Sequence, residues 1–538
     1  MVSKRGCLLL AVELACTALA VPAQVFANDE AARAETTTPI KHVIVIFNEN
    51  ESFDHYFGTY PYATNPAGEP AFHALPGTPR ANNLLSGGLL DQNPNSTQPF
   101  RLDTGLKSVT CDQNHSYTPE QQAADHGLMD KYPQFTGSGS STSSPCNDYG
   151  KGPGVVMGYF DGNTVTAMWN YAQHYAMSDN SYGTMFGPSA VGAINLIAGT
   201  TATATLAPQE PNGSPASAAG SIANGANSGA LIGDARPFGD ECVLTNSQLQ
   251  TTTMVTIAGR NVGDLLNSKQ ITWGWFEGGF APTGFDAKGR AVCGSHHAGL
   301  AGDDAVETVG DYIPHHEPFQ YFTSTQNLHH VLPKDDSLIG TSLDGANHQY
   351  DLSAFWTALG EGRLPSVTYL KAAAYQDAHP GYSDPIDEQA FVVGVINAVQ
   401  NSAFWSDTAI IIAYDDSDGW YDHVLGPVVN QSAVSDDALV APGNCGSSST
   451  ATQGRCGYGP RLPLLVISPY AKQNYIDHRI VDQSSILRFI EDNWDLGRIG
   501  ADSTDSKAGM LNGLFDFSED HRASKLILDP STGVALAR

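Results

Sequence analysis

The stretch Lys41-His-Val-Ile-Val-Ile-Phe-Asn-Glu-Asn-Glu-Ser-Phe-Asp-His-Tyr-Phe-Gly58 says most about the fold of this 538-residue chain. Its five consecutive apolar residues, Val43 to Phe47, predict a strand that is buried on both faces, as in a parallel sheet. The strand runs directly into Glu49 and Asn50. Oxygen ligands at the end of a buried strand are typical of sites at the carboxyl edge of open α/β sheets. The alternative interpretation is a polar loop that simply follows a core strand.

Further apolar runs along the chain predict strands at residues 271–276, 365–370, 409–414 and 464–468. Helical patterns at residues 387–404 and 484–494 separate some of these runs. The alternation favours an α/β fold with a mostly parallel sheet.

Two segments have the composition of loops. Residues 200–234 are rich in Ala, Ser, Gly and Asn, and we expect a long surface insertion because strand-like runs continue after them. Residues 137–144 predict a second, flexible loop. We therefore expect one folded domain over residues 28–538 with long loop insertions.

The N-terminus predicts export. Lys4 and Arg5 precede an apolar stretch over residues 7–21, and Val25-Phe26-Ala27 offers a small-residue cleavage site, so residues 1–27 resemble a signal peptide. No other run approaches the roughly 18 apolar residues of a membrane span. A formal charge of −29 disfavours nucleic acid and anionic lipid as partners. We expect an exported protein, periplasmic or secreted, and the sequence indicates no particular oligomeric state.

Six cysteines would remain after cleavage, and an even number in an exported chain favours disulfides. Cys445 and Cys456 bracket a segment rich in Gly, Ser and Thr, so we expect them to pair. Cys111–Cys146 and Cys242–Cys293 are guesses for the other two pairs. The spacing of the cysteines fits no zinc pattern.

A second buried-type strand, at residues 409–414, delivers Asp415 and Asp416 to its carboxyl end. Adjacent residues of a strand point to opposite faces, so both can reach one ion only where the strand breaks into a loop. Together with Glu49 and Asn50 they would form an all-oxygen set suited to one hard or borderline divalent cation. The alternative is a solvated acidic loop.

Gly187-Pro188-Ser189 is followed by an apolar, helix-compatible run, which places Ser189 at a helix start. Backbone amides and the helix dipole favour an anion such as phosphate there. A metal-activated Ser189 could therefore be a nucleophile, although serine is also an ordinary helix cap.

Imidazoles could supply the proton that a leaving alkoxide needs. With 17 histidines in the chain, any single one could instead be structural. The candidates that stand in polar motifs are His115, His126, His315, His316, His379 and His423.

Taken together, these segments resemble the bacterial phosphoesterase family that contains acid phosphatases and phosphatidylcholine-type phospholipases C. The resemblance covers most of the mature chain and rests on many motifs in one order. These are Glu49–Gly58, Gly127–Asp130, Met157–Asp161, Gly187–Ser189, His315–Phe322, Tyr414–Asp416, Trp420–His423, Arg461–Pro463, Ile467–Tyr470 and Ser485–Glu491.

The resemblance implies an alkaline-phosphatase-like, three-layer α/β/α core and a covalent phosphoseryl or phosphothreonyl intermediate. It implies that Ser189 is the nucleophile. The residues that it implies as ligands of one divalent metal ion are Glu49, Asn50, Asp415 and Asp416. It also implies that His316 and His379 bind phosphate or protonate the leaving group, with His115 and His315 nearby.

The chain departs from the family pattern in three places. Glu51 stands where the first motif usually has Arg, Ser189 is followed by Ala-Val-Gly rather than x-Pro-Asn, and Asp415-Asp-Ser-Asp-Gly419 replaces Asp-Glu-His-Gly-Gly. A serine nucleophile and the lack of a long extension after about residue 520 favour the acid-phosphatase branch, which acts on small phosphate esters.

Two alternatives remain. A phospholipase C would need an apolar or aromatic entrance for a quaternary ammonium group and acyl chains. The aromatic residues that could line one are Trp273, Trp275, Phe276, Trp420 and Tyr421. A secreted binding protein that kept the fold and lost the chemistry is the other alternative, and the retention of all four implied ligands argues against it.

Overall fold

The computed structural model describes residues 35–103, 110–138, 149, 151–298, 309–441, 444–446, 453–518 and 523–536. The signal peptide predicted at residues 1–27 lies outside these residues, as do Cys146 and most of the loop predicted at 137–144. Nothing in the structure therefore tests the Cys111–Cys146 pairing.

A central sheet of eight strands forms the middle layer. In spatial order the strands are β15 (Gln349–Asp351), β10 (Trp273–Glu277), β16 (Val367–Lys371), β1 (His42–Asn48), β17 (Thr408–Tyr414), β18 (Leu464–Ile467), β4 (Ala176–Ser178) and β19 (Tyr475–Asp477). The strands from β15 to β17 pair in parallel, β18 is antiparallel to both of its neighbours, and β4 and β19 are parallel. The prediction of a mostly parallel sheet is confirmed.

All five strands predicted from apolar runs are present, with shifted ends. β16 begins at Val367 because Pro365 has no N–H to donate to a neighbouring strand. The same strand continues to Lys371, which pairs with Glu277 at the end of β10. Lys371 and Glu277 are buried although their side chains are ionisable. The apolar runs that predicted these two strands therefore end one residue earlier, at residues 370 and 276.

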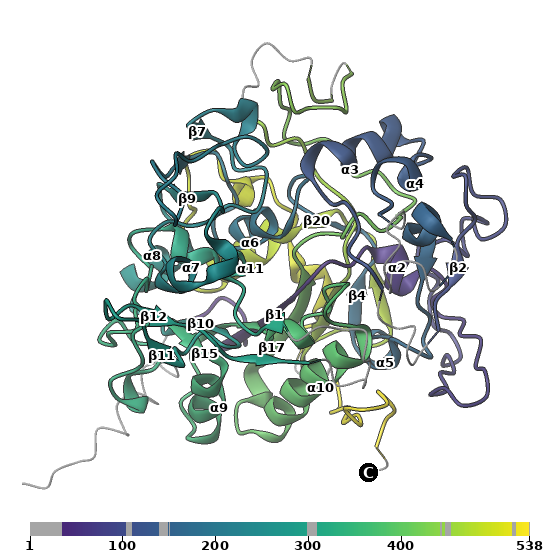
Figure 1. Cartoon of the computed structure of the whole chain (residues 1–538). Coiled ribbons are helices and arrows are strands. Elements are labelled where there is room, and N and C mark those ends of the chain that lie inside the picture. The colour runs from purple at the N-terminus through teal and green to yellow at the C-terminus, as the bar shows by residue number, and fades with distance from the viewer. Residues whose placement is uncertain are drawn as a thin grey trace, which may run out of the picture.

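Helices cover both faces of the sheet, which confirms the predicted three layers. Figure 1 shows α5 (Thr166–His174), α9 (Leu352–Gly360) and α10 (Pro385–Asn401) on one face. On the opposite face lie α6 (Ser189–Ala198), α8 (Val262–Ser268) and α11 (Gln483–Asn493). The helices predicted at 387–404 and 484–494 correspond to α10 and α11. Asp384 and Asp482 cap their first turns.

The register of β1 sets up the site. β1 is buried along its whole length and lies between β16 and β17. Asn48, its last residue, pairs with Tyr414, the last residue of β17. The residues that follow the two strands, Glu49 and Asp415, therefore emerge side by side at the carboxyl edge of the sheet.

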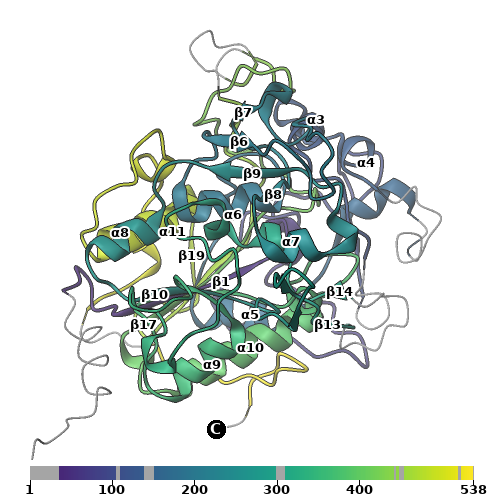
Figure 2. The ribbon, with the colours of Figure 1, turned by 60° about the vertical axis from the view of Figure 1, so that its left-hand side comes forward.

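The segment predicted as a surface insertion contributes to a second, small sheet. Its strands are β7 (Ser228–Gly229), β6 (Ala204–Leu206), β9 (Met254–Ile257) and β8 (Arg236–Pro237), in that spatial order. Figure 2 shows this sheet above α6. Ile222 and Leu231 are fully buried in the main hydrophobic core, so the segment packs against the domain although its sequence lacks a clear period.

The remaining elements are short. The strands are β2 (Phe100–Arg101), β3 (Gly158–Tyr159), β5 (Ser181–Tyr182), β11 (Gly284–Phe285), β12 (Ala291–Val292), β13 (His296–His297), β14 (Val309–Gly310) and β20 (Val481–Asp482). The helices are α2 (Phe53–Phe57), α3 (Tyr117–Ala124), α4 (Tyr132–Phe135) and α7 (Glu241–Thr245). Among the described residues, no helix combines the length and apolar character that crossing a membrane requires.

Two of the three expected disulfides are present, Cys242–Cys293 and Cys445–Cys456. The suggested aromatic entrance is wrong, because all five of its residues are at most 3% exposed. Trp273 and Trp275 lie within the buried strand β10, and Trp420 stacks on the ring of His55 at 4.0 Å. These rings form core and line no opening.

Candidate active site

The four predicted metal ligands directly follow β1 and β17. Glu49, Asn50, Asp415 and Asp416 are each at most 3% exposed. The backbone N–H of Asn50 donates to Asp415 Oδ1 at 2.9 Å, which locks the two loops together. Asn50 has a φ of 62°, a left-handed conformation that Asn tolerates better than most residues. This turn brings its side chain over the end of β17.

Ser189 is the first residue of α6, as predicted, but it does not cap the helix. Pro188 occupies the cap position and the Ser189 side chain makes no capping bond. Its hydroxyl instead donates to Asp416 Oδ2 at 3.1 Å and lies 3.5 Å from Asn50 Oδ1. The ordinary structural role of a serine at a helix start is therefore excluded for Ser189.

A glycine one turn later allows this approach. A Cβ on Gly192 would lie 2.0 Å from the backbone oxygen of Asp415, so any larger residue would push α6 away from the loop after β17. Gly192 thus sets the distance between Ser189 and Asp416. The role of Gly192 was not predicted, because nothing about a glycine in an apolar helical run indicates a functional residue.

The backbone amides at the start of α6 are engaged within the protein. Ala190 N donates to Asp234 Oδ1 at 3.0 Å and Val191 N donates to the Pro188 oxygen at 2.9 Å. Asp234 comes from the predicted insertion and was not predicted as a site residue. Its carboxylate occupies the position at which the sequence analysis expected the amides to bind phosphate.

The acidic loop after β17 is not solvated. Asp418 and Asp422 are fully buried. Asp418 Oδ1 accepts from Asn50 Nδ2 at 3.2 Å and lies 3.0 Å from His115 Nδ1. Asp418 thereby connects His115 to the strand-end residues, and the alternative of a solvated loop is wrong.

Burial shifts the pKa values of the loop carboxyls. It raises the pKa of Asp416 well above its usual range, and the neighbouring charge of Asp415 adds to this effect. For His115, burial alone would lower the pKa, but Asp416 and Asp418 together raise it well above its ordinary value. Of the four predicted histidines, His115 is the one whose pKa the neighbouring carboxylates raise.

The other three predicted histidines surround the same place. His316 Nδ1 lies 3.3 Å from Glu49 Oε1, and the rings of His315 and His316 are 4.4 Å apart. The ring of His379 is 6.3 Å from that of His115. Burial lowers the pKa of His315, His316 and His379, so these three are neutral at neutral pH.

Two of the histidines singled out from motifs lie elsewhere. His126 is exposed. His423 Nδ1 lies 2.5 Å from Asp54 Oδ2 in a separate buried cluster in which Arg461 bonds to Asp422. Neither contacts a residue that we assign to the site.

Two ionisable residues of the site, Lys371 and Asp377, were not predicted. Lys371, at the end of β16, forms a buried ion pair with Glu49. Asp377 accepts from the backbone N–H of His379 at 3.0 Å, and burial raises its pKa to about 8. Glu49 and Asp415 were predicted because each stands close after an apolar, strand-like run. The same rule, applied to the run at residues 365–370, also identifies Lys371.

The side chains of the site suit a divalent cation. Buried carboxylate oxygens without a hydrogen-bond partner are costly, and they occur here on Glu49 (Oε2), Asp415 (Oδ2) and Asp377 (Oδ2). Glu49, His316 and Asp377 carry ligand atoms within 4.8 Å of one another. A cation bound among these atoms would satisfy them, and an oxygen-rich set suits a hard or borderline ion.

A cavity of about 240 Å³ opens beside the nucleophile candidate. His115 lines it together with Pro188, the residue before Ser189. Other wall residues come from the start of α3 and from the insertion, among them Asp234. The insertion therefore forms part of the wall of this cavity.

The chain is similar to a family of phosphoesterases and to several phospholipases C. Residues 40–497 match the model of the Phosphoesterase family. Non-hemolytic phospholipase C of Burkholderia pseudomallei is 24% identical over 488 residues, which is 88% of this chain and 57% of that protein. Phospholipase C B of Mycobacterium tuberculosis is 23% identical over 504 residues, which is 91% of this chain and 80% of that protein.

Other matches are shorter or weaker. Non-hemolytic phospholipase C of Pseudomonas aeruginosa is 32% identical over 143 residues, 24% of this chain and 20% of that protein. A crystal structure of a protein in the alkaline phosphatase superfamily from Vibrio parahaemolyticus matches 64% of this chain and 65% of its own with 12% identity and a TM-score of 0.28. Since the family model covers most of the sequence, from before β1 to beyond α11, the chain belongs to the Phosphoesterase family.

Proposed function

We propose that this protein is an exported, metal-dependent hydrolase that cleaves small phosphate monoesters through a phosphoseryl intermediate on Ser189. One observation carries the proposal. The Ser189 hydroxyl is not used to cap α6 and donates instead to Asp416, in a pocket of buried carboxylates that suits a divalent cation. The two disulfides support export, because such bonds persist in oxidising compartments.

In the first step, Ser189 Oγ attacks phosphorus and the bond between phosphorus and the alcohol oxygen breaks. Asp416 Oδ2 accepts a hydrogen bond from the Ser189 hydroxyl and so orients Oγ for this attack. When bound, the divalent ion would lower the pKa of the hydroxyl and offset charge on the phosphoryl oxygens. Water then cleaves the phosphoseryl bond and releases phosphate.

Lys371 and His316 are the groups that we propose to bind the phosphoryl oxygens. His316 Nε2 is buried without a partner and Lys371 carries the buried positive charge beside Glu49. Fixed donors of this kind stabilise charge that develops in the transition state. The amides of α6, which were predicted to bind phosphate, are bonded to Asp234 and Pro188 instead. We propose that Lys371 and His316 bind the phosphoryl oxygens in their place.

We propose His115 as the acid that protonates the leaving alcohol. It lines the cavity beside Pro188, and carboxylates hold its pKa high. The sequence analysis gave this part to His316 or His379, but burial lowers the pKa of both. A neutral imidazole has no proton of suitable acidity to give at neutral pH.

The variant His115→Gln tests this assignment. We expect kcat for an alkyl phosphate such as glycerol phosphate to fall about 10²–10⁴-fold, because its alkoxide must be protonated as it leaves. Cleavage of p-nitrophenyl phosphate should change much less, since nitrophenolate leaves without a proton. Steady-state kinetics on both esters measure the difference, with His126→Gln as the control at an exposed histidine. Equal losses on the two esters would contradict a role as general acid.

The size of the cavity supports small esters as substrates. A volume of about 240 Å³ is below the range of roughly 300–1,000 Å³ usual for pockets of drug-sized ligands. The aromatic residues suggested for lipid binding are buried in the core.

Phospholipase C is the second candidate, because the curated relatives quoted above carry that name. We expect the purified protein to hydrolyse p-nitrophenyl phosphate and glycerol phosphate faster than phosphatidylcholine vesicles. A chelator should stop the reaction and added divalent ion should restore it. Lipid cleavage with little turnover of monoesters would transfer the assignment to phospholipase C. Tight phosphate binding without any turnover would instead support a binding protein.

A further inference from the structure

A second cavity of about 590 Å³ lies at the other end of the sheet edge, where β10, β15 and β16 end. Its walls come from the loop after β10, from β13, from the segment that follows β16, and from α9 and α10. Figure 2 shows β13 and β14 beside α10. The cavity lies within the range of about 300–1,000 Å³ that is usual for small-molecule sites.

Aromatic rings contribute much of the wall. Trp356 on α9 lines the cavity and is 41% exposed. Most other large side chains among the described residues are buried. Tyr375 and His297 also line the cavity, with ring centroids 4.8 Å apart. Phe391 on α10 completes the set. The faces of such rings attract cations through their quadrupole.

The charged groups of the wall are acidic. Asp311 and Asp351 line the cavity, and the lining residues include neither lysine nor arginine. Asp311 is only 3% exposed, accepts from the Ser295 hydroxyl and lies 2.8 Å from His297 Nδ1. Asp351 caps α9 and accepts from Ser353, so both aspartates act on the cavity through their charge. After burial itself, Asp311 and Asp387 raise the pKa of Tyr375, which reflects a negative potential in this cavity.

Gly394 borders the cavity from the 17-residue helix α10. A Cβ added to it would meet no other atom within 4 Å, so a larger side chain at this position would enter open space.

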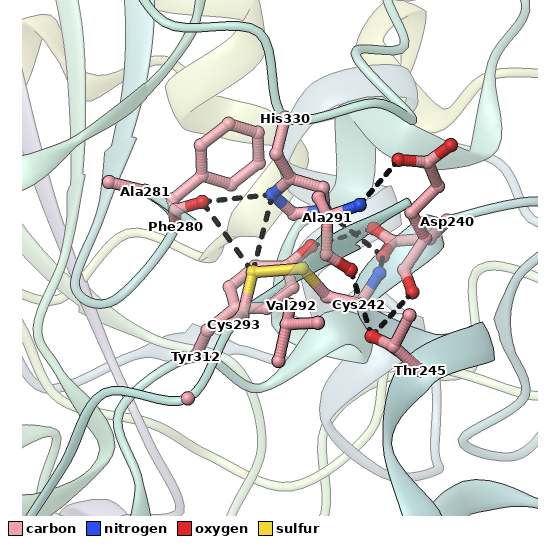
Figure 3. The surroundings of a disulfide bond; sticks show 12 residues. Asp240, Cys242, Thr245, Phe280, Ala281, Ala291, Val292, Cys293, Tyr312 and His330 are labelled. Carbon is pink, nitrogen blue, oxygen red and sulfur yellow. Dashed lines mark hydrogen bonds and ion pairs between the residues drawn. A yellow bond between two sulfur atoms is a disulfide. The ribbon is translucent and has the colours of Figure 1, made fainter. Parts of the chain in front are cut away.

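The loop that forms one wall is rigid although it contains little regular structure. Figure 3 shows the Cys242–Cys293 disulfide, which ties this region to α7. His330 is fully surrounded by protein, donates from Nδ1 to the Phe280 oxygen at 2.9 Å, and lies 3.1 Å from Asp240 Oδ1 through Nε2. Phe280 sits between Gly279 and Ala281, which both line the cavity.

The cavity is separate from the catalytic centre. The segment after β16 divides the two: Lys371 and Asp377 contact the catalytic residues, whereas Ala373, Tyr375 and Gln376 line the cavity. A ligand in the cavity would therefore not compete directly with the phosphate ester. The site does not depend on the proposed function.

We propose that this cavity is a binding site for a small organic cation, such as a substituted ammonium ion, held between aromatic faces in the negative field of Asp311 and Asp351. The rigid wall and the open space beside Gly394 pre-form the site, so binding requires little reorganisation. Anions are disfavoured, because every fixed negative charge of the wall would oppose them.

Ligand-observed NMR on the full-length mature protein tests the proposal with choline and its neutral isostere 3,3-dimethylbutan-1-ol as probes. We expect choline to bind and the isostere to bind about tenfold more weakly, because only choline carries the charge that rings and carboxylates attract. Equal binding of both probes, or no binding of choline, would overturn the proposal.

Two variants locate the binding. Gly394→Leu fills the cavity from α10 with a better helix-forming residue, so we expect choline binding to be lost while the thermal transition is kept. Gly360→Leu is the matched control, because a Cβ on Gly360 in α9 also meets open space and the residue does not line the cavity. Trp356→Leu should weaken choline binding without affecting phosphate ester hydrolysis. Unchanged choline binding in Gly394→Leu would place the cation elsewhere and contradict the inference.

Discussion

Replacing Ser189 by alanine is expected to reduce the hydrolysis of phosphate monoesters by about 10⁴–10⁶-fold, the range found when the nucleophile of a covalent mechanism is removed. The hydroxyl is the group that would form the bond to phosphorus. No other hydroxyl among the described residues is hydrogen-bonded to Asp416. The fold should survive, because the change removes one hydrogen bond and costs about 1 kcal/mol.

The measurement is kcat/KM for p-nitrophenyl phosphate, together with far-UV circular dichroism and a thermal melt of the same preparation. Ser189→Thr keeps a hydroxyl at this position and should retain partial activity. Ser247→Ala is the control at an exposed serine that lines neither cavity. Acid quenching of the wild type during turnover should yield a phosphorylated peptide that contains Ser189. A well-folded alanine variant with normal turnover would rule out the covalent mechanism.

The sequence predicted those parts of the site that follow from strand ends. An apolar run that stops at acidic residues identified Glu49 and Asp415, because a buried strand can carry polar side chains only where it leaves the core. The parallel register then brings them together, since Asn48 and Tyr414 end as partners. Residues placed by this logic needed no knowledge of the tertiary fold beyond the order of the strands.

The parts that could not be predicted depend on long-range packing. Gly192 matters only because α6 touches the loop after β17. Asp234 comes from a segment without periodicity and reaches the amide of Ala190 only after its own small sheet has formed. Exposure was equally unpredictable: Trp273 and Trp356 look alike in sequence, yet one is fully buried and the other is exposed to a cavity.

The charge arrangement explains why Asp415 should be critical to the site. Its Oδ1 accepts from the backbone N–H groups of Asn50 and Asp416, at 2.9 and 2.7 Å, and so shapes both strand-end loops. Its Oδ2 is buried without a partner. One oxygen therefore holds the loops, and the other is left for a cation, because a buried unpaired carboxylate oxygen is costly.

Asp415→Asn separates these two tasks. The amide oxygen can still accept both backbone hydrogen bonds, so we expect the loops and the thermal stability to be largely retained. The variant loses the negative charge and replaces the second oxygen by an NH₂ group, which cannot bind a cation. We expect metal affinity to fall by more than about a hundredfold and hydrolysis to become undetectable, since effects of this class supply several kcal/mol of transition-state stabilisation.

Metal analysis of the purified protein and titration calorimetry with the identified ion measure the affinity independently of turnover. Asp495→Asn is the matched control, because this residue is exposed, remote from the site and has a φ of 49° that asparagine tolerates. Full metal occupancy in Asp415→Asn would exclude Asp415 as a ligand and shift the site to Glu49, His316 and Asp377, which already lie within ligand distance of one another. Lost activity with retained metal would instead mean that Asp415 acts by positioning Asn50 and Asp416 beside Ser189.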